Sequence, residues 1–218
     1  MISKRLVTIA TLLKKDMIVA DIGTDHAFLP IYLIKNQISE YVYATDNKSG
    51  PLLQANKNII QAQLTDHIQT VLTDGLDDLA SDIQALVIAG MGVDTIISIL
   101  DKHQDHLKHY QQIIVQPNNN VYRMRQWIAK HAYKITDEKL IKEYKYYQII
   151  SFDPQSRANY DEKDNYFGPC LRQEKDPLFL KYHHDHYLKL KNLYQKYPQK
   201  PTLKEFDILA DYFKEYPY

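Results

Sequence analysis

The nine residues from Val19 to Ala27, Val-Ala-Asp-Ile-Gly-Thr-Asp-His-Ala, constrain the fold of this chain more than any other segment. A short apolar run ends in an acid and a glycine, and a helical pattern follows. This order is typical of the first strand of a parallel α/β sheet, whose carboxyl end faces a nucleotide-like ligand. Gly23 allows the backbone to turn sharply and to approach a ligand closely. We therefore predict a ligand site at the end of this strand.

The charge of the turn indicates which ligand it can hold. Loops that bind pyrophosphate are usually rich in glycine and present helix amides to the anion. Here Asp21 and Asp25 flank a single glycine, and two carboxylates would repel a pyrophosphate. S-adenosylmethionine carries an ammonium and a sulfonium and has no phosphate. The turn therefore favours this methyl donor over a nicotinamide dinucleotide.

The rest of the chain alternates between short apolar runs and amphipathic helical patterns. Strands are predicted at residues 17–20, 41–45, 68–72, 85–89 and 113–115, followed by a hairpin over 133–152. Helices are predicted at residues 3–14, 26–35, 49–62, 94–108 and 120–131. Such alternation indicates a parallel sheet with right-handed crossovers. The predicted fold class is α/β, a Rossmann-like sheet of the class I methyltransferase type.

A second domain is predicted after residue 152. Residues 153–168 are polar, contain Pro154 and end in Gly168, which predicts a linker. Beyond it, apolar residues at helical spacing predict two helices, 177–196 and 202–216, packed as an antiparallel pair. We therefore expect a catalytic-type domain at 1–152 and a linker plus helical domain at 153–218.

Ligands of open α/β sheets bind outside the carboxyl ends of the strands. Asp46 follows the second strand and can accept both ribose hydroxyls of an adenosyl group, although an acid here also suits a helix cap. Asp74 can accept from an adenine amino group, although Asp74-Gly75 is also a common turn. Ala89 and Gly90 end the fourth strand and leave room for a flat ligand. The predicted donor-binding residues are Asp21, Gly23, Asp46, Asp74, Gly75, Ala89 and Gly90.

The fifth strand ends in Gln116, Pro117 and Asn118, whose amides can read a base edge by paired hydrogen bonds. An asparagine-rich turn explains the same residues. Arg123 and Arg125 fall early in the next helix, where they either contact phosphate or are solvated. We predict that these five residues contact the substrate.

Two further patterns concern RNA and metals. Lysines alternate with tyrosines between residues 134 and 147, which suits contact with an RNA backbone, although nearby acids dilute the charge. The run His183-His184-Asp185-His186 contains potential metal ligands, but in a helix these residues point to different faces. We expect no metal site.

Composition limits the remaining possibilities. The 27 Lys and Arg balance 27 Asp and Glu, and neither half of the chain is strongly basic, so any nucleic-acid surface must be local. Cys170 is the only cysteine, which excludes an intrachain disulfide and fits a reducing compartment. No apolar run is long enough to span a membrane, and the first residues do not read as a signal peptide. We expect a cytoplasmic monomer.

Four strings in this sequence together resemble one family. They are Asp-Ile-Gly-Thr-Asp-His-Ala-Phe-Leu-Pro at 21–30, Ile-Ala-Gly-Met-Gly at 88–92, Gln-Pro-Asn at 116–118, and Phe-Gly-Pro at 167–169 with Pro-Leu-Phe at 177–179. They resemble the bacterial tRNA (adenine-22 N1)-methyltransferases of the TrmK family over nearly the whole chain. The resemblance implies an S-adenosylmethionine domain, a coiled-coil-like helical domain, and methylation of adenine 22 in the D-arm region of tRNA. It departs at Val93, where the family usually has another glycine.

The implied reaction needs positioning more than proton transfer. N1 of adenine has an available lone pair, so attack on the donor methyl requires no obligatory base. N1 lies on the Watson–Crick edge, which favours an unpaired or flipped base. The product base is cationic, so an acid near it would help. Asp25 is the first candidate and Asp94 the second, although Asp25 could equally cap the following helix.

Three other functions remain open at this point. A nicotinamide-dependent oxidoreductase would use the same fold, although the missing glycines and extra acids count against it. A non-catalytic RNA-binding module would not need the donor-compatible residues at four strand ends. A methyltransferase acting on another RNA differs only in the substrate that the resemblance implies.

Overall fold

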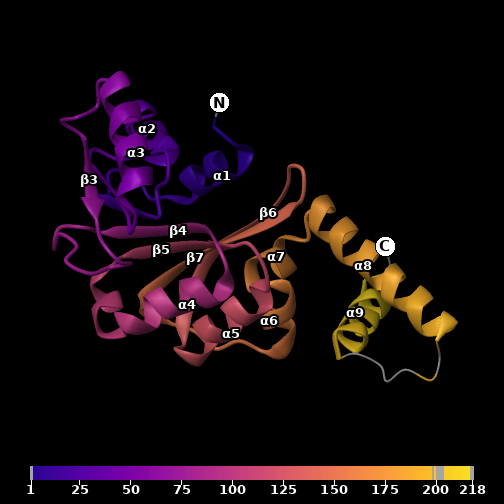
Figure 1. Cartoon of the computed structure of the whole chain (residues 1–218). Coiled ribbons are helices and arrows are strands. Elements are labelled where there is room, and N and C mark those ends of the chain that lie inside the picture. The colour runs from indigo at the N-terminus through magenta and orange to yellow at the C-terminus, as the bar shows by residue number, and fades with distance from the viewer. Residues whose placement is uncertain (1, 198, 200–203, 217–218) are drawn as a thin grey trace. The chain divides into compact units, whose positions relative to one another are not determined.

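The computed structural model describes residues 2–197, 199 and 204–216, and the chain divides into two compact units between Asn159 and Tyr160 (Figure 1). The first unit contains a seven-stranded sheet in the order β3-β2-β1-β4-β5-β7-β6. Its strands are β1 (Val19–Ile22), β2 (Val42–Asp46), β3 (Ile68–Leu72), β4 (Ala85–Met91), β5 (Gln112–Pro117), β6 (Tyr133–Lys142) and β7 (Tyr146–Arg157). Strands β1 to β5 pair in parallel, and β7 pairs antiparallel with β5 and β6. The predicted α/β fold is confirmed.

Strand order reverses on the two sides of β1. Val19 pairs with Val42 of β2 on one side and with Ala85 of β4 on the other. The chain therefore passes from β1 outward through β2 to β3, and then crosses back to β4 on the other side of β1. Such a switch point leaves a crevice beyond the carboxyl ends of the strands, because the crossovers on its two sides lie on opposite faces.

The helices of the first unit are α1 (Lys4–Leu12), α2 (Phe28–Lys35), α3 (Ser49–Gln61), α4 (Val93–Lys102) and α5 (Val121–Lys130), with a 3₁₀ helix, η1 (Gln104–His109), after α4. The strands of the sheet centre are almost wholly apolar because helices cover both faces. The single helix predicted at 94–108 is divided: His103 leaves helical dihedral angles, and Leu107 is buried from η1 instead.

The hairpin of β6 and β7 is longer than predicted. It continues to Arg157, five residues beyond the expected end at 152. The carboxylate of Asp153 accepts the backbone N–H groups of Gln155 and Ser156, which supports an irregular register at this point. Residues 153–157 are therefore strand, and a polar composition concealed it.

The described residues of the second unit form four helices. They are α6 (Glu162–Phe167), α7 (Pro169–Glu174), α8 (Pro177–Lys196) and α9 (Lys204–Glu215). The linker predicted at 153–168 is therefore wrong: Asp161 and Asp164 form a capping box for α6, and Gly168-Pro169 separates it from α7. Both helices have six residues, too few to show a helical period. The prediction for α8 is confirmed, and residues 202 and 203 of the last predicted helix lie outside the described residues.

Helices α8 and α9 form the predicted antiparallel pair. Tyr194 near the end of α8 contacts Phe206 near the start of α9, and His184 contacts Phe213 near the end of α9. His183 is buried against the rings of Phe167 and Phe179. Within the described residues, no group of three His, Cys, Asp or Glu side chains is arranged to hold a metal ion. None of the described helices combines the length and apolar character that a membrane span requires.

Candidate functional site

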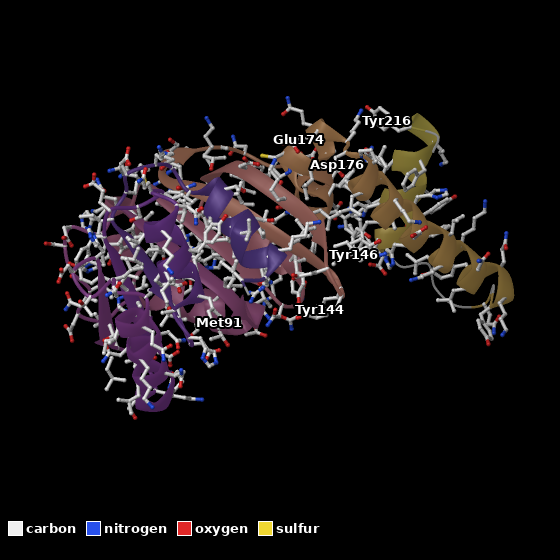
Figure 2. The ribbon with its side chains drawn as sticks, turned by 90° about the horizontal axis from the view of Figure 1, so that it is seen from above. Met91, Tyr144, Tyr146, Glu174, Asp176 and Tyr216 are labelled. Carbon is white, nitrogen blue, oxygen red and sulfur yellow. The ribbon has the colours of Figure 1, made fainter. Side chains whose placement is uncertain are left out.

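The turn after β1 is fixed to β2 by its backbone. The N–H groups of Gly23 and Thr24 both donate to the carbonyl oxygen of Thr45, at 2.9 and 2.8 Å. Gly23 has a φ of +75°, and a Cβ here would lie 2.3 Å from the Cε of Met91. Met91, labelled in Figure 2, thus reaches from the end of β4 over the β1 turn. The positive φ favours glycine at position 23, and any side chain here would also displace the terminal methyl of Met91.

Asp21 supplies a buried carboxylate at the end of β1. Its side chain accepts a 2.8 Å hydrogen bond from the hydroxyl of Thr24, and the residue is only 6% exposed. Burial raises the pKa of Asp21 to about 6, and the Thr24 hydrogen bond and the charge of Arg5 partly oppose this rise. A carboxylate that is short of counter-charge favours the binding of a cation.

Two adjoining cavities lie at the switch point. One, of about 660 Å³, is bounded by the ends of β1 to β4 and the start of α4. The other, of about 400 Å³, lies between α1 and the β1 turn. Both are lined by Gly23, Asp25, Ala89 and Gly90. The larger cavity adds the predicted residues Asp46, Asp74, Gly75 and Asp94, and the smaller adds Asp21.

Asp46 and Asp74 line the larger cavity from the ends of β2 and β3. Asp46 accepts the N–H of Lys48 at 3.0 Å, but α3 begins at Ser49 without a side-chain cap. Asp74 is well exposed and lies 3.7 Å from the Nζ of Lys102. Gly75 has a φ of +66°, with Ile99 close against its α-carbon. Both acids therefore present carboxylate oxygens to the larger cavity.

Arg5 of α1 is a site residue that the sequence analysis missed. Its Nη1 donates to the Oε1 of Gln116 at 2.5 Å, and the backbone N–H of Gly90 donates to the same oxygen at 3.2 Å. A Cβ at position 90 would lie 3.1 Å from Nη1, so glycine leaves room for the guanidinium. Arg5 thus shares the smaller cavity with Asp21. No sequence signal could place it there, because only tertiary packing brings α1 to this edge.

The turn after β5 has a different role from the one predicted. Gln116 is fully buried. Its Oε1 accepts hydrogen bonds from Arg5 and from the N–H of Gly90, and its Nε2 donates to the carbonyl of Pro117. Asn118 donates from Nδ2 to the carbonyl of Gly90 at 2.6 Å, and Pro117 pairs with Met91 in the sheet. The interpretation of Gln116 as a reader of a base edge is wrong for this conformation. The amide side chains hold the end of β4 and position Arg5.

Arg125 is also placed differently. It is 1% exposed and donates at 2.7 Å both to Glu138 of β6 and to Gln148 of β7. This buried ion pair joins α5 to the hairpin, so the predicted phosphate contact by Arg125 is wrong. Arg123 remains exposed and forms an ion pair with Asp94. Arg123, predicted to contact phosphate, is therefore paired at the surface with Asp94, the second predicted catalytic acid.

Asp25 lies on the rim of both cavities. It is exposed, has a φ of +53°, and contacts the Nε2 of His26 at 3.5 Å. Helix α2 begins at Phe28 with Ala27 as its N-cap and no side-chain cap. The alternative of Asp25 as a helix cap is therefore not observed. A non-glycine residue in the left-handed region at a cavity rim is typical of a functional loop.

Val93, where this sequence departs from the resemblance, is accommodated by the helix. It is the first residue of α4, it is buried, and its N–H donates to the Oδ1 of Asn119 at 3.0 Å. A β-branched residue tolerates the right-handed helical region, so no glycine is needed here.

The site as a whole fits a zwitterionic amino-acid group joined to a nucleoside. Asp21 offers an anion to an ammonium, and Arg5 offers a cation to a carboxylate in the same cavity. The larger cavity offers carboxylate acceptors for hydroxyl and amino groups, and the absence of a Cβ at Gly23 and Gly90 leaves room for the side chains of Met91 and Arg5.

Comparisons with known proteins agree on one family. A family profile described as TrmK, tRNA (adenine(22)-N(1))-methyltransferase, matches residues 19–215. The tRNA (adenine(22)-N(1))-methyltransferase of Bacillus subtilis is 34% identical over 187 residues, which cover 83% of this chain and 79% of that protein. A crystal structure from Streptococcus pneumoniae in complex with S-adenosyl-L-methionine is 30% identical, with a TM-score of 0.83 over 98% of this chain and 97% of that one. M. capricolum TrmK with S-adenosyl-homocysteine is 30% identical, with a TM-score of 0.80 over 99% and 96%.

Proposed function

Because the chain belongs to the TrmK family of tRNA (adenine(22)-N(1))-methyltransferases, we propose that it transfers the methyl group of S-adenosylmethionine to N1 of adenine 22 in tRNA. The observation that carries this function is the buried carboxylate of Asp21 at the switch point, opposite the guanidinium of Arg5. A pyrophosphate ligand would face Asp21, Asp25 and Asp46 at once, so the site disfavours a dinucleotide.

Each group at the strand ends has a distinct part in holding the donor. Asp21 binds the ammonium and Arg5 the carboxylate of its amino-acid end. Asp46 accepts the ribose hydroxyls, and Asp74 accepts the adenine amino group. Gly23, Gly75, Ala89 and Gly90 line the cavities with little or no side chain, so the ligand contacts their backbone.

The donor supplies an electrophilic methyl group when it is bound. The lone pair of adenine N1 forms the new N–C bond while the S–C bond of the sulfonium breaks, and no proton has to be removed. The protein contributes by orienting the base and excluding competing nucleophiles. Asp25 places a negative charge on the rim of both cavities, where it stabilises the cationic base as it forms. Asp94 is the weaker candidate for this role, since Arg123 neutralises it.

The proposed function also leads to expectations about cellular location, oligomeric state and metal requirement. A tRNA-modifying enzyme of this kind acts in the cytoplasm. One chain contributes every group named at the donor site, so we expect a monomer that needs no metal ion. Size-exclusion chromatography with light scattering, and activity after treatment with EDTA, test these two expectations.

Methyl transfer from labelled S-adenosylmethionine to an unmodified bacterial tRNA transcript tests the proposal. We expect 1-methyladenosine in the digested nucleosides, and its loss when adenine 22 is replaced by guanine. If only ribosomal RNA became labelled, tRNA would not be the substrate. If the protein bound NADH and not S-adenosylmethionine, it would not be a methyltransferase.

The Asp25→Ala variant tests the catalytic assignment within the same assay. We expect kcat to fall about tenfold or more while the Kd for the donor stays within twofold, because Asp25 acts on the product charge. An unchanged kcat would remove Asp25 from the mechanism.

A further inference from the structure

The tip of the β6–β7 hairpin, residues 142–147, lies at the same edge of the sheet as the donor site. Ile113 of β5 pairs with Phe152 of β7, and Val115 pairs with Ile150. Because the two strands are antiparallel, the start of β7 lies beside the carboxyl end of β5. The hairpin continues past this pairing to Lys142 opposite Tyr146. It therefore projects beyond the carboxyl ends of the parallel strands as a two-stranded arm (Figure 1).

The hairpin tip carries an exposed aromatic ring and two lysines. Tyr144, labelled in Figure 2, is 84% exposed and packs edge-to-face on Tyr147, with 5.6 Å between ring centroids. The Nζ of Lys145 lies 5.0 Å from the Tyr147 ring, and the Nζ of Lys142 lies 5.3 Å from the Tyr146 ring. Apart from its contact with Tyr147, the Tyr144 ring is open to a ligand.

The acids near the hairpin are already occupied. Glu138 is buried in its ion pair with Arg125, and Asp137 lies 3.1 Å from Lys139. Glu143 accepts the backbone N–H of Lys4 at 2.8 Å. Two of these three acids are therefore paired with cations, and the third, Glu143, is held by the backbone of α1 and keeps its charge.

Contacts connect the hairpin tip with the donor site. The bond from Lys4 to Glu143 pins the tip to the start of α1. The guanidinium of Arg5 lies 5.7 Å from the ring of Tyr147 and bonds Gln116 at the cavity. A molecule held at the tip is therefore beside the site where methyl transfer takes place.

Charge is distributed unequally along the first unit. Residues 58–101, the acidic flank, contain seven Asp and no Lys or Arg. Residues 102–157, the basic flank, contain ten Lys and Arg and five Asp and Glu. A polyanion approaching the switch point is therefore favoured on the side of the hairpin.

We propose that the hairpin tip is an RNA-binding arm, in which Tyr144 stacks on an unpaired base of the substrate and Lys142 and Lys145 contact its backbone phosphates. This inference rests on the proposed function, since the RNA is the one whose adenine is methylated. Stacking on an exposed tyrosine requires a base outside a duplex, and the same requirement applies to the reacting adenine.

The test measures binding of an unmodified tRNA transcript to the full chain in the presence of S-adenosylhomocysteine, over a series of salt concentrations. Tyr144→Ala is expected to raise the Kd at least about fivefold, the lower end of what one stacked base contributes, and Tyr144→Trp to restore it. The double variant K142Q/K145Q is expected to lower the slope of log K against log salt by about 1.5, for two phosphate contacts. The Kd for S-adenosylmethionine is expected not to change.

Matched controls lie before the amino ends of the parallel strands, whereas the hairpin tip lies beyond their carboxyl ends. Tyr41 precedes β2, and Lys15 is exposed before β1, so Tyr41→Ala and Lys15→Gln remove the same side-chain types far from the hairpin. If the hairpin variants bind tRNA like these controls while the wild type methylates it, the RNA-binding arm is refuted and the proposed function stands. If the wild type neither binds nor methylates tRNA, the proposed function itself fails.

Discussion

The acidic and basic flanks of the first unit contrast in charge although they share one sheet. The acidic flank supplies Asp74 and Asp94 to the larger cavity, whereas the basic flank supplies the hairpin tip with Lys142 and Lys145. The proposed donor is a cation and the proposed acceptor a polyanion. A chain of zero net charge can therefore attract both substrates, because it separates its charges by region.

The flanks meet at the ion pair between Asp94 and Arg123. Arg123 lies on α5, on the basic flank, and Asp94 lies in the first turn of α4, on the acidic one. The contrast between the flanks predicts that changes on the donor side alter donor affinity alone, and that changes on the hairpin side alter RNA affinity alone.

Asp21→Asn is expected to have the largest effect. The amide keeps the size of the side chain and removes the charge that pairs with the donor ammonium, so the Kd for S-adenosylmethionine should rise about 100-fold. Isothermal titration calorimetry measures it. tRNA binding by the same variant should stay within twofold, and a parallel loss of tRNA binding would show that the donor and RNA sites are not separate.

Arg5→Gln is expected to raise the Kd for the donor about tenfold. The variant loses the cation for the donor carboxylate, while glutamine can still reach the amide of Gln116. Arg5→Lys should recover part of the affinity, since the charge stays but the two-pronged geometry does not. A donor Kd unchanged in Arg5→Gln would remove Arg5 from the donor site.

The pH dependence of donor affinity follows from Asp21. Because the pKa of Asp21 is raised to about 6, the carboxylate is lost by protonation as pH falls below 6, and the Kd should be about tenfold weaker at pH 5 than at pH 7. Titrations between pH 5 and 7 measure this, and the profile of Asp21→Asn should be flat. A wild-type profile as flat as that of the variant would mean that another group binds the ammonium.

Folding stability should change in the opposite direction. The folded pKa of about 6 exceeds the unfolded value of 3.8, so the folded state binds the proton more tightly between these values. The free energy of unfolding therefore falls by about 3 kcal/mol in total as pH rises from well below 3.8 to well above 6 on account of this group, and about 2 kcal/mol of this fall lies between pH 4 and pH 6. Asp21→Asn should remove this fall and be more stable than wild type at pH 7, as chemical denaturation without donor can test.

Local pattern was sufficient to predict the strands and the donor side of the site. Asp21, Gly23, Asp46 and Asp74 follow short apolar runs directly, and parallel pairing alone brings such positions to one edge. Helices α6 and α7 were not predicted, because six residues do not complete two helical turns and so show no helical period.

The basic side could not be predicted in the same way. Arg125 and Arg123 lie two residues apart on one helix, yet the first is buried against Glu138 and the second is exposed. Only the packing of α5 against the hairpin decides between them. Arg5 shows the converse, because a residue of the first helix enters the site through a contact with Gln116, which is far away in sequence.

Arg123→Gln should have the smallest effect and sharpens the boundary between the flanks. Its ion pair with Asp94 is exposed, and such pairs contribute at most about 1 kcal/mol. We expect the donor Kd and the free energy of unfolding to remain close to those of wild type, and the Kd for tRNA to rise by about twofold through loss of one cation. A tenfold loss of tRNA affinity, measured beside the hairpin variants, would instead extend the RNA contact from the hairpin tip to the start of α5, next to Asp94 of the acidic flank.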